Sequence, residues 1–237
     1  MKSLLSLGII SLLLSVELSA EVAGKHLFIL SGQSNMVWLK PKVAFTPAVE
    51  KEFGNDKVIV VHDAQSGKPL HRWLKSWKTP EGVKPEASGD LYDRLMAKVK
   101  KATEGQKLAS VTFIWMQGER DARLQWSSLY EAGFKSLLQQ LETDLGRKDL
   151  NVVIGRLSDF DNDNRSYQDC SKMRAILQKI AEEHPRGDWV NTDDLNDGIN
   201  RKGEKISNDL HYSVEGYKLL GERFAAKAIA LVRRAET

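Results

Sequence analysis

A serine placed on a turn directly after a buried strand is the first group in this sequence that could do chemistry. Ser34 lies in the segment GQSNM, residues 32–36, and the apolar run Leu27–Leu30 precedes it. Gly32 ends that run, so the turn presents the hydroxyl at the carboxyl end of a strand, where open α/β sheets place their sites. A serine hydroxyl is a poor nucleophile alone, so the chain must also supply a base and donors for an oxyanion.

His211 is the candidate base, since it lies in the segment DLH, residues 209–211, directly before the predicted last helix. We expect Ser34 Oγ to attack a carbonyl carbon and His211 to take the proton and return it to the leaving group. The remaining histidines lie outside such a setting, and only one of them, His71, is near another motif. They are His26, His62, His71 and His184.

Two more polar segments follow predicted strands. Residues 65–73, QSGKPLHRW, come after one apolar run, and residues 115–121, WMQGERD, come at the end of another. Segments of this kind meet at one edge of a parallel sheet and can converge on one crevice. We expect the oxyanion donors to be the backbone N–H groups of Ser34 and Gly67 and the side chain of Gln117, because a glycine backbone can approach a ligand closely.

These four motifs, taken in their order along the chain with DLH last, resemble the SGNH/GDSL hydrolase superfamily. Within it they are most similar to the sialate O-acetylesterase-like domain, also grouped as carbohydrate esterase family 6. The resemblance covers nearly the whole chain after residue 20. It implies a flavodoxin-like α/β fold, a catalytic triad, and hydrolysis of acetyl esters on sugar hydroxyls through a serine acyl-enzyme without a cofactor. Relatives often use an asparagine as the third oxyanion donor, and Gln117 resembles its replacement.

Two residues, Asp209 and Glu119, are candidates for the acid that orients His211. The superfamily pattern places an aspartate three residues before the histidine, but this chain has Asn208 there and Asp209 one residue later. An amide could orient the ring but could not stabilise an imidazolium by charge. Asp209 could serve if the local loop differs, Glu119 of the QGE motif could serve instead, or both could contribute.

Four residues near these motifs are candidate substrate contacts. Asp121 either caps a turn or binds a sugar hydroxyl, and Arg120 narrows the pocket, contacts an anionic sugar or points outward. Trp73 and Trp38 either line a sugar or acetyl pocket or pack in the core.

The remaining pattern predicts a three-layer α/β/α sandwich with a central parallel sheet. Five nearly continuous apolar runs are typical of strands covered on both faces, and amphipathic helical stripes alternate with them. Asp90 and Ser213 are candidate N-caps for two of the helices. The runs are Leu27–Leu30, Val58–Val61, Val111–Met116, Val152–Leu157 and Trp189–Asn191.

Residues 1–20 have the layout of a secretory signal peptide. Lys2 precedes an apolar stretch that is short for a membrane span, and Ala20 stands at the expected cut. We therefore expect one domain over residues 21–237, secreted or periplasmic, with no membrane attachment after cleavage.

The composition indicates which kinds of partner and cofactor are not expected. Lys and Arg exceed Asp and Glu by only 3 and are scattered, so a nucleic-acid surface is not expected. The Asp-rich residues 159–164 lack the glycine and glutamate of a calcium loop, so no metal is expected. A single cysteine, Cys170, excludes an internal disulfide and fits a small residue at a helix start. Nothing in the sequence sets an oligomeric state.

Two hypotheses for function follow. The first is a secreted carbohydrate O-acetyl esterase acting on acetylxylan or sialate-type sugars. The second is a carbohydrate-binding pseudo-esterase that has lost efficient turnover, for which the departure at Asn208 is the motivation.

Overall fold

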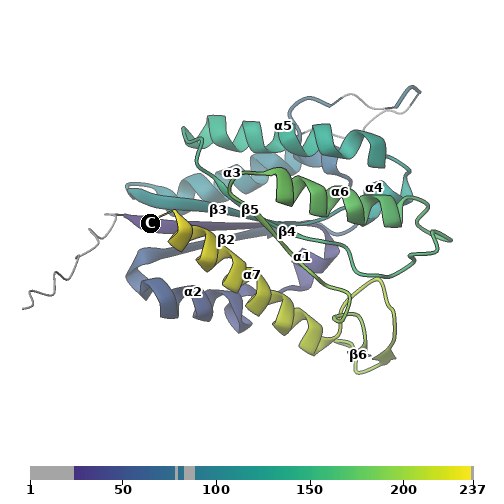
Figure 1. The fold of residues 1–237 in the computed structure, drawn as a ribbon. Helices are drawn as coiled ribbons and strands as arrows, with labels where there is room; N and C mark the ends of the chain where they lie inside the picture. The colour runs from purple at the N-terminus through teal and green to yellow at the C-terminus, as the bar shows by residue number, and fades with distance from the viewer. Residues whose placement is uncertain (1–23, 78–79, 83–88, 236–237) are drawn as a thin grey trace, which may run out of the picture.

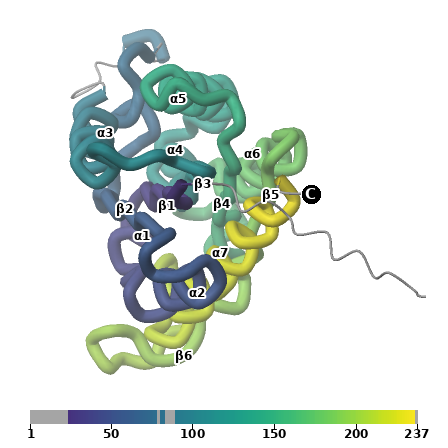
Figure 2. Tube along the Cα trace, turned by 90° about the vertical axis from the view of Figure 1, so that its left-hand side faces the viewer, coloured from purple at the N-terminus to yellow at the C-terminus, as the bar shows by residue number. Residues whose placement is uncertain are grey.

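The centre of the molecule is a five-stranded parallel sheet with the strand order β2-β1-β3-β4-β5. The computed structural model describes residues 24–77, 80–82 and 89–235. Figure 2 shows the strands in this order across the molecule. The strands are β1 (Lys25–Gly32), β2 (Val58–Ala64), β3 (Leu108–Met116), β4 (Asn151–Gly155) and β5 (Gly187–Val190).

Helices cover both faces of this sheet, as Figure 1 shows. On one face lie α1 (Ser34–Trp38), α2 (Phe45–Phe53) and α7 (Val214–Arg234). On the other lie α3 (Asp90–Thr103), α4 (Glu119–Arg123), α5 (Ser127–Leu145) and α6 (Cys170–Glu183). The three-layer α/β/α sandwich predicted from the sequence is therefore confirmed.

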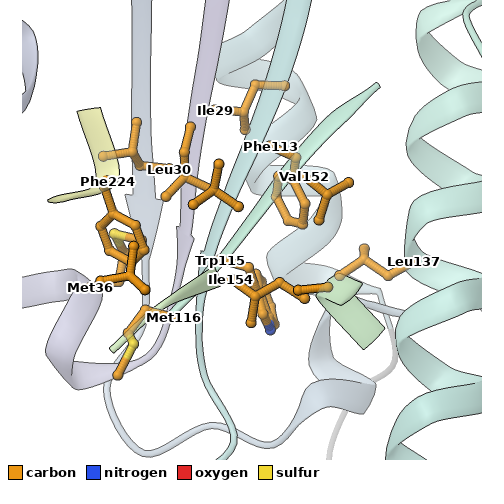
Figure 3. Close-up of a cluster of buried hydrophobic side chains, with 14 of the residues drawn as sticks. Ile29, Leu30, Met36, Phe113, Trp115, Met116, Leu137, Val152, Ile154 and Phe224 are labelled. Carbon is orange, nitrogen blue, oxygen red and sulfur yellow. The ribbon is translucent and has the colours of Figure 1, made fainter. Parts of the chain in front are cut away.

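The core lies in two layers, one on each face of the sheet. Successive strand residues point to opposite faces, and because both faces are covered, both sets are apolar. Figure 3 shows Leu30 and Met116 beside Phe224 of α7, while Phe113 and Trp115 lie on the other side of the strands. These side chains are all fully buried. This packing explains why the strand sequences are continuous apolar runs.

All five predicted strands are present, and one of the two predicted caps is correct. Ser213 caps α7, since its side chain accepts a hydrogen bond from the backbone N–H of Gly216 at 3.0 Å. The prediction for Asp90 is wrong, because Gly89 occupies the cap position and Asp90 is the first helical residue. The Asp90 carboxylate instead accepts from Arg72 Nε at 2.7 Å.

The sequence patterns did not predict the short elements. These are α1, α2, α4, three short 3₁₀ helices (Pro41–Val43, Asn55–Lys57 and Leu70–Trp73) and a small hairpin of β6 (Gly198–Ile199) and β7 (Lys205–Ile206). Three of them carry or flank site residues. The predicted signal peptide, residues 1–20, lies outside the described residues. No helix in the described part of the chain is long and apolar enough to cross a membrane.

The strand order changes direction at β1, since the chain continues to β2 on one side and later places β3 on the other. The carboxyl ends of β1 and β3 therefore border a crevice of the kind that binds ligands in open α/β sheets. Gly32 ends β1 with a φ of +145°. A Cβ there would lie 1.9 Å from the carbonyl oxygen of Met116, so only glycine fits between these strand ends.

Candidate active site

The structure brings together two predicted residues that are far apart in the sequence. Ser34 begins α1 directly after β1, and His211 lies in the loop before α7. The Nε2 atom of His211 is 3.1 Å from Ser34 Oγ, which is hydrogen-bond distance for a nucleophile and its base. Ser34 is 6% exposed, and the His211 side chain is 29% exposed. A substrate could therefore approach this pair.

Asn35 links the segments that carry Ser34 and His211, and sequence reasoning missed it. Its Nδ2 donates to Glu119 Oε1 at 2.9 Å and to the carbonyl of Leu210 at 3.2 Å. Its Oδ1 accepts from the hydroxyl of Tyr217 at 2.8 Å. One buried amide thus connects α1, α4, α7 and the loop of His211. Its place beside Ser34 in the sequence is the only signal that could have found it.

Glu119 is a buried carboxyl that lines the same pocket. Burial is the main cause that raises its pKa to about 7, although the hydrogen bond from Asn35 acts in the opposite direction. Its Oε2 atom is buried and has no hydrogen-bond partner among the described residues. Glu119 reaches the loop of His211 through Asn35, which donates to both Glu119 and Leu210.

Asp209 is close to His211 but is not hydrogen-bonded to its ring. Asp209 Oδ1 lies 3.9 Å from His211 Nδ1, while the same oxygen accepts the backbone N–H of His211 at 2.8 Å. Asn208 stands in a left-handed conformation, with φ +47°, and its side chain accepts from Asn196. Burial lowers the pKa of His211, Asp209 raises it, and the positive charge of Arg201 lowers it.

A pocket of about 230 Å³ opens onto the Ser34–His211 pair. Gly67 contributes to its wall and has a φ of +65°, with open space where a Cβ would stand. The backbone N–H of Ser34 is at the first position of α1, where it has no partner within the helix. The lining residues are Gln33, Ser34, Trp38, Ser66, Gly67, Glu119, Arg120, Arg123, Tyr167, Leu210 and His211.

Gln117, the predicted third oxyanion donor, is not among the residues that line this pocket. It is fully buried, and its amide donates to Asp121 Oδ2 at 2.5 Å, Gln33 Oε1 at 3.2 Å and the carbonyl of Lys68 at 3.3 Å. Its own oxygen accepts the hydroxyl of Tyr130 at 2.7 Å. Both amide hydrogens of Gln117 are therefore used in hydrogen bonds within the protein, and the bond to Gln33 supports a residue of the pocket wall.

Asp121 and Trp73, two candidate substrate contacts, are also absent from the pocket lining. The Asp121 carboxylate accepts the backbone N–H of Leu70 at 3.0 Å, which matches the capping alternative, and burial raises its pKa to about 7. The Trp73 indole donates to Ser31 Oγ at 3.1 Å, and its ring packs edge-on against Trp115. Both side chains are fully buried.

Two aromatic rings in the pocket wall, Trp38 and Tyr167, each contact the guanidinium group of an arginine. The Trp38 ring lies 4.3 Å from the His211 ring, and the guanidinium of Arg201 lies 3.6 Å from the Trp38 centroid. The guanidinium of Arg123 lies 5.8 Å from the Tyr167 ring. The sequence analysis named Trp38 and Arg120 as candidates. It missed Arg123, Tyr167 and Arg201, because these three residues lie outside the four motifs.

The described residues contain no candidate metal site, because no three histidine, cysteine or acidic side chains are arranged to hold a metal ion.

The strand order is that of a flavodoxin-like α/β protein, and the Ser34–His211 pair opens onto a pocket at the carboxyl ends of its strands. A family model described as carbohydrate esterase, sialic acid-specific acetylesterase matches residues 38–230. The chain therefore belongs to this family, and the resemblance inferred from the four motifs is confirmed.

Solved structures agree with this fold. A protein from Arabidopsis thaliana matches with a TM-score of 0.64 and 17% identity, over 87% of this chain and 98% of that one. A carbohydrate acetylesterase from Xanthomonas citri matches with a TM-score of 0.65 and 16% identity, over 89% of this chain but only 57% of that one. A family 3 carbohydrate esterase from Clostridium thermocellum matches with a TM-score of 0.54 and 12% identity, over 90% and 100%. No curated protein matches this chain.

Proposed function

We propose that this protein is an exported serine esterase, secreted or periplasmic, that removes acetyl groups from carbohydrate hydroxyls. The observation that carries the proposal is the 3.1 Å contact between His211 Nε2 and Ser34 Oγ at the base of an open pocket. Membership in a carbohydrate esterase family supports the reaction type. The apolar residues 1–20 support export.

The first half of the reaction forms an acyl-enzyme. His211 Nε2 accepts the proton of Ser34 as Oγ attacks the acetyl carbonyl carbon. The backbone N–H groups of Ser34 and Gly67 are the donors proposed for the resulting oxyanion. The intermediate then collapses, and His211 gives the proton to the departing sugar oxygen.

The second half releases acetate. Water attacks the acetyl carbonyl carbon as His211 takes one of its protons, and the proton returns to Ser34 Oγ as the acyl bond breaks. We assign the electrostatic support of the imidazolium to Asp209, because its carboxylate is 3.9 Å from Nδ1. We assign Glu119 a positioning role, which it exerts through Asn35 on the loop of His211.

Three arginines at the pocket support an acidic sugar rather than a neutral one as the substrate. Arg120 and Arg123 line it, and Arg201 lies beside it on Trp38. None of these three arginines forms a salt bridge with any described residue, whereas Arg223 is held by Asp194 at 2.6 Å. A pocket of about 230 Å³ suits a short acyl group. We therefore propose acetylated sugars that bear a carboxylate as the preferred substrates, ahead of acetylxylan.

The test of the reaction is hydrolysis of 4-nitrophenyl acetate by the chain from residue 21 and by its Ser34→Ala variant. We expect the variant to lose activity by at least about 10³-fold, because the nucleophile is gone. Ser128→Ala, an exposed serine on α5, is the matched control and should keep wild-type activity. Equal near-background rates in wild type and Ser34→Ala would favour the pseudo-esterase alternative.

The test of the substrate compares an O-acetylated sialic acid with acetylated xylo-oligosaccharides. We expect Arg120→Gln and Arg123→Gln to raise KM for the acidic sugar and to leave 4-nitrophenyl acetate hydrolysis nearly unchanged. Arg233→Gln removes the same charge from the opposite end of α7, where it pairs with Glu52, and is the control. Equal KM values for acidic and neutral sugars would contradict this assignment.

A further inference from the structure

A hairpin leads directly into the segment that carries His211. We call residues 197–208 the strap. Its two legs pair at Gly198–Ile206 and Ile199–Lys205, and the backbone N–H of Asn208 donates to Asp197 Oδ1 at 2.7 Å. The next residue, Asp209, donates its backbone N–H to the carbonyl of Asn196 at 3.2 Å. The position of the strap therefore sets where residues 209–211 begin. Figure 1 shows the hairpin beside the N-terminal end of α7.

Arg201 lies in the turn of the strap, where hydrogen bonds of Asn200 fix the backbone. The side-chain oxygen of Asn200 accepts the backbone N–H of Lys202 at 2.9 Å and of Glu204 at 3.0 Å. The backbone of Asn200 also exchanges hydrogen bonds with Gly203 and Glu204, both at 2.9 Å. Arg201 is thus held between residues whose conformation is fixed by local hydrogen bonds.

The side chain of Arg201 reaches the helix that carries the nucleophile. Its guanidinium lies 3.6 Å from the centre of the Trp38 ring. Trp38 is the last residue of α1, and Ser34 is the first residue of the same helix. The Trp38 ring in turn lies 4.3 Å from the His211 ring. The strap therefore contacts α1 through Arg201 and Trp38, beside the Ser34–His211 hydrogen bond.

This contact matters for the base, because within the described residues Nδ1 of His211 has no hydrogen-bond partner. The nearest carboxylate oxygen, on Asp209, is 3.9 Å away and is already bonded to the backbone of His211. We propose that Arg201 is a positioning residue, which by stacking on Trp38 holds the strap against α1 and keeps the His211 ring aimed at Ser34. The proposal rests on the esterase function proposed above.

The charge of Arg201 also acts on His211. The charged and titratable groups around the ring come from five segments. They are Asp209 from its own loop, Arg201 from the strap, Glu119, Arg120 and Arg123 from α4, Tyr167 before α6, and Tyr217 from α7. Arg201 lowers the pKa of His211 and Asp209 raises it. Removal of the Arg201 charge should therefore raise the pKa of His211 and move the acid limb of the rate profile to higher pH.

The experiment measures kcat/KM for 4-nitrophenyl acetate against pH in Arg201→Gln, Trp38→Leu and the double variant. This substrate has no sugar and no anionic group, so an effect on it cannot come from substrate charge. We expect Arg201→Gln to lower kcat/KM at pH 7 about two- to fivefold, the range that a stacked arginine contributes. Its acid limb should lie at higher pH than that of the wild type. Arg201→Lys should restore part of the rate and most of the pH profile.

The double variant separates positioning from independent effects. If Arg201 positions the strap through Trp38, the double variant should be no slower than Trp38→Leu alone at pH values above the acid limb, where the charge of Arg201 no longer affects the rate through the pKa of His211. Lys202→Gln removes an exposed charge from the next residue of the same turn and should behave as wild type. An unchanged pH profile in Arg201→Gln, or losses that multiply in the double variant, would overturn the proposal. Activity that survives Ser34→Ala would instead overturn the esterase function itself.

Discussion

The residue pair Ser34–His211 has a short contact on one side of the imidazole and a long one on the other. Nε2 is 3.1 Å from Ser34 Oγ, whereas Nδ1 is 3.9 Å from Asp209 Oδ1. A carboxylate at this distance stabilises the imidazolium by charge without a direct hydrogen bond. The base therefore depends on both electrostatics and packing, and each contribution can be tested separately.

We expect Asp209→Asn to lower kcat for 4-nitrophenyl acetate by on the order of 10- to 100-fold, because the imidazolium loses its nearest negative charge. Glu119→Gln should lower it less, about threefold, since an amide oxygen can still accept the hydrogen bond from Asn35. Steady-state kinetics of the two purified variants decide between the two acids. Near-wild-type turnover in Asp209→Asn with a loss of orders of magnitude in Glu119→Gln would assign the role to Glu119.

At the scale of elements, Asn35 holds four segments together and allows a graded test. Asn35→Ala removes two donated hydrogen bonds and one accepted one, and leaves the Glu119 carboxyl without its donor. We expect its free energy of unfolding in urea to fall by about 2–4 kcal/mol and kcat to fall with it. Tyr217→Phe removes the bond that Asn35 Oδ1 accepts and also the longer bond, 3.3 Å, from the backbone N–H of Tyr212 to the Tyr217 hydroxyl, but it leaves both bonds donated by Asn35 in place. It should cost less, about 1–2 kcal/mol. Equal losses in both variants would contradict the role of Asn35 as the link.

The ends of β1 and β3 approach so closely that one position tolerates only glycine. In Gly32→Ala the new methyl group would meet the carbonyl of Met116 at 1.9 Å. We expect a loss of about 3 kcal/mol or more in the free energy of unfolding, because backbone must move. Gly67→Ala is the control, since φ is also positive but the space is open, and should cost about 1 kcal/mol. Thermal unfolding of both variants gives the comparison.

For the whole molecule, two buried carboxyls predict how stability changes with pH. Burial raises the pKa of Glu119 from 4.5 and of Asp121 from 3.8, both to about 7. The folded state therefore holds more protons than the unfolded chain between these values. The stability that these two groups contribute is present below about pH 4 and is lost as pH rises through about 7.

Glu119→Gln should remove its share of this dependence. Relative to the wild type, the variant should gain stability between pH 5 and pH 8, by up to about 3 kcal/mol. Urea unfolding at several pH values measures the difference, and the exposed Glu104→Gln is the control. A constant difference between variant and wild type across this range would show that Glu119 titrates normally.

The sequence by itself determined the sheet, the helical layers and the order of the site segments. Its five apolar runs identify strands because both faces of the sheet are covered, so the burial signal is local and continuous. The same holds for Ser213, whose cap is formed by a residue three positions away. Ser34 and His211 could be singled out because each lies in a short motif next to a predicted element.

The tertiary structure alone decided which polar residues face the pocket. The motifs predict Gln117 and Asp121 as site residues, but both side chains bond to residues from other segments, which no local pattern reveals. These partners are Gln33 before α1, Tyr130 of α5 and the backbone of Leu70. Asn35 meets Leu210 across 175 positions of the chain. Arg201 stands in a turn with no motif and acquires its place only when the strap packs against α1. Long-range packing, which depends on all layers at once, sets these contacts.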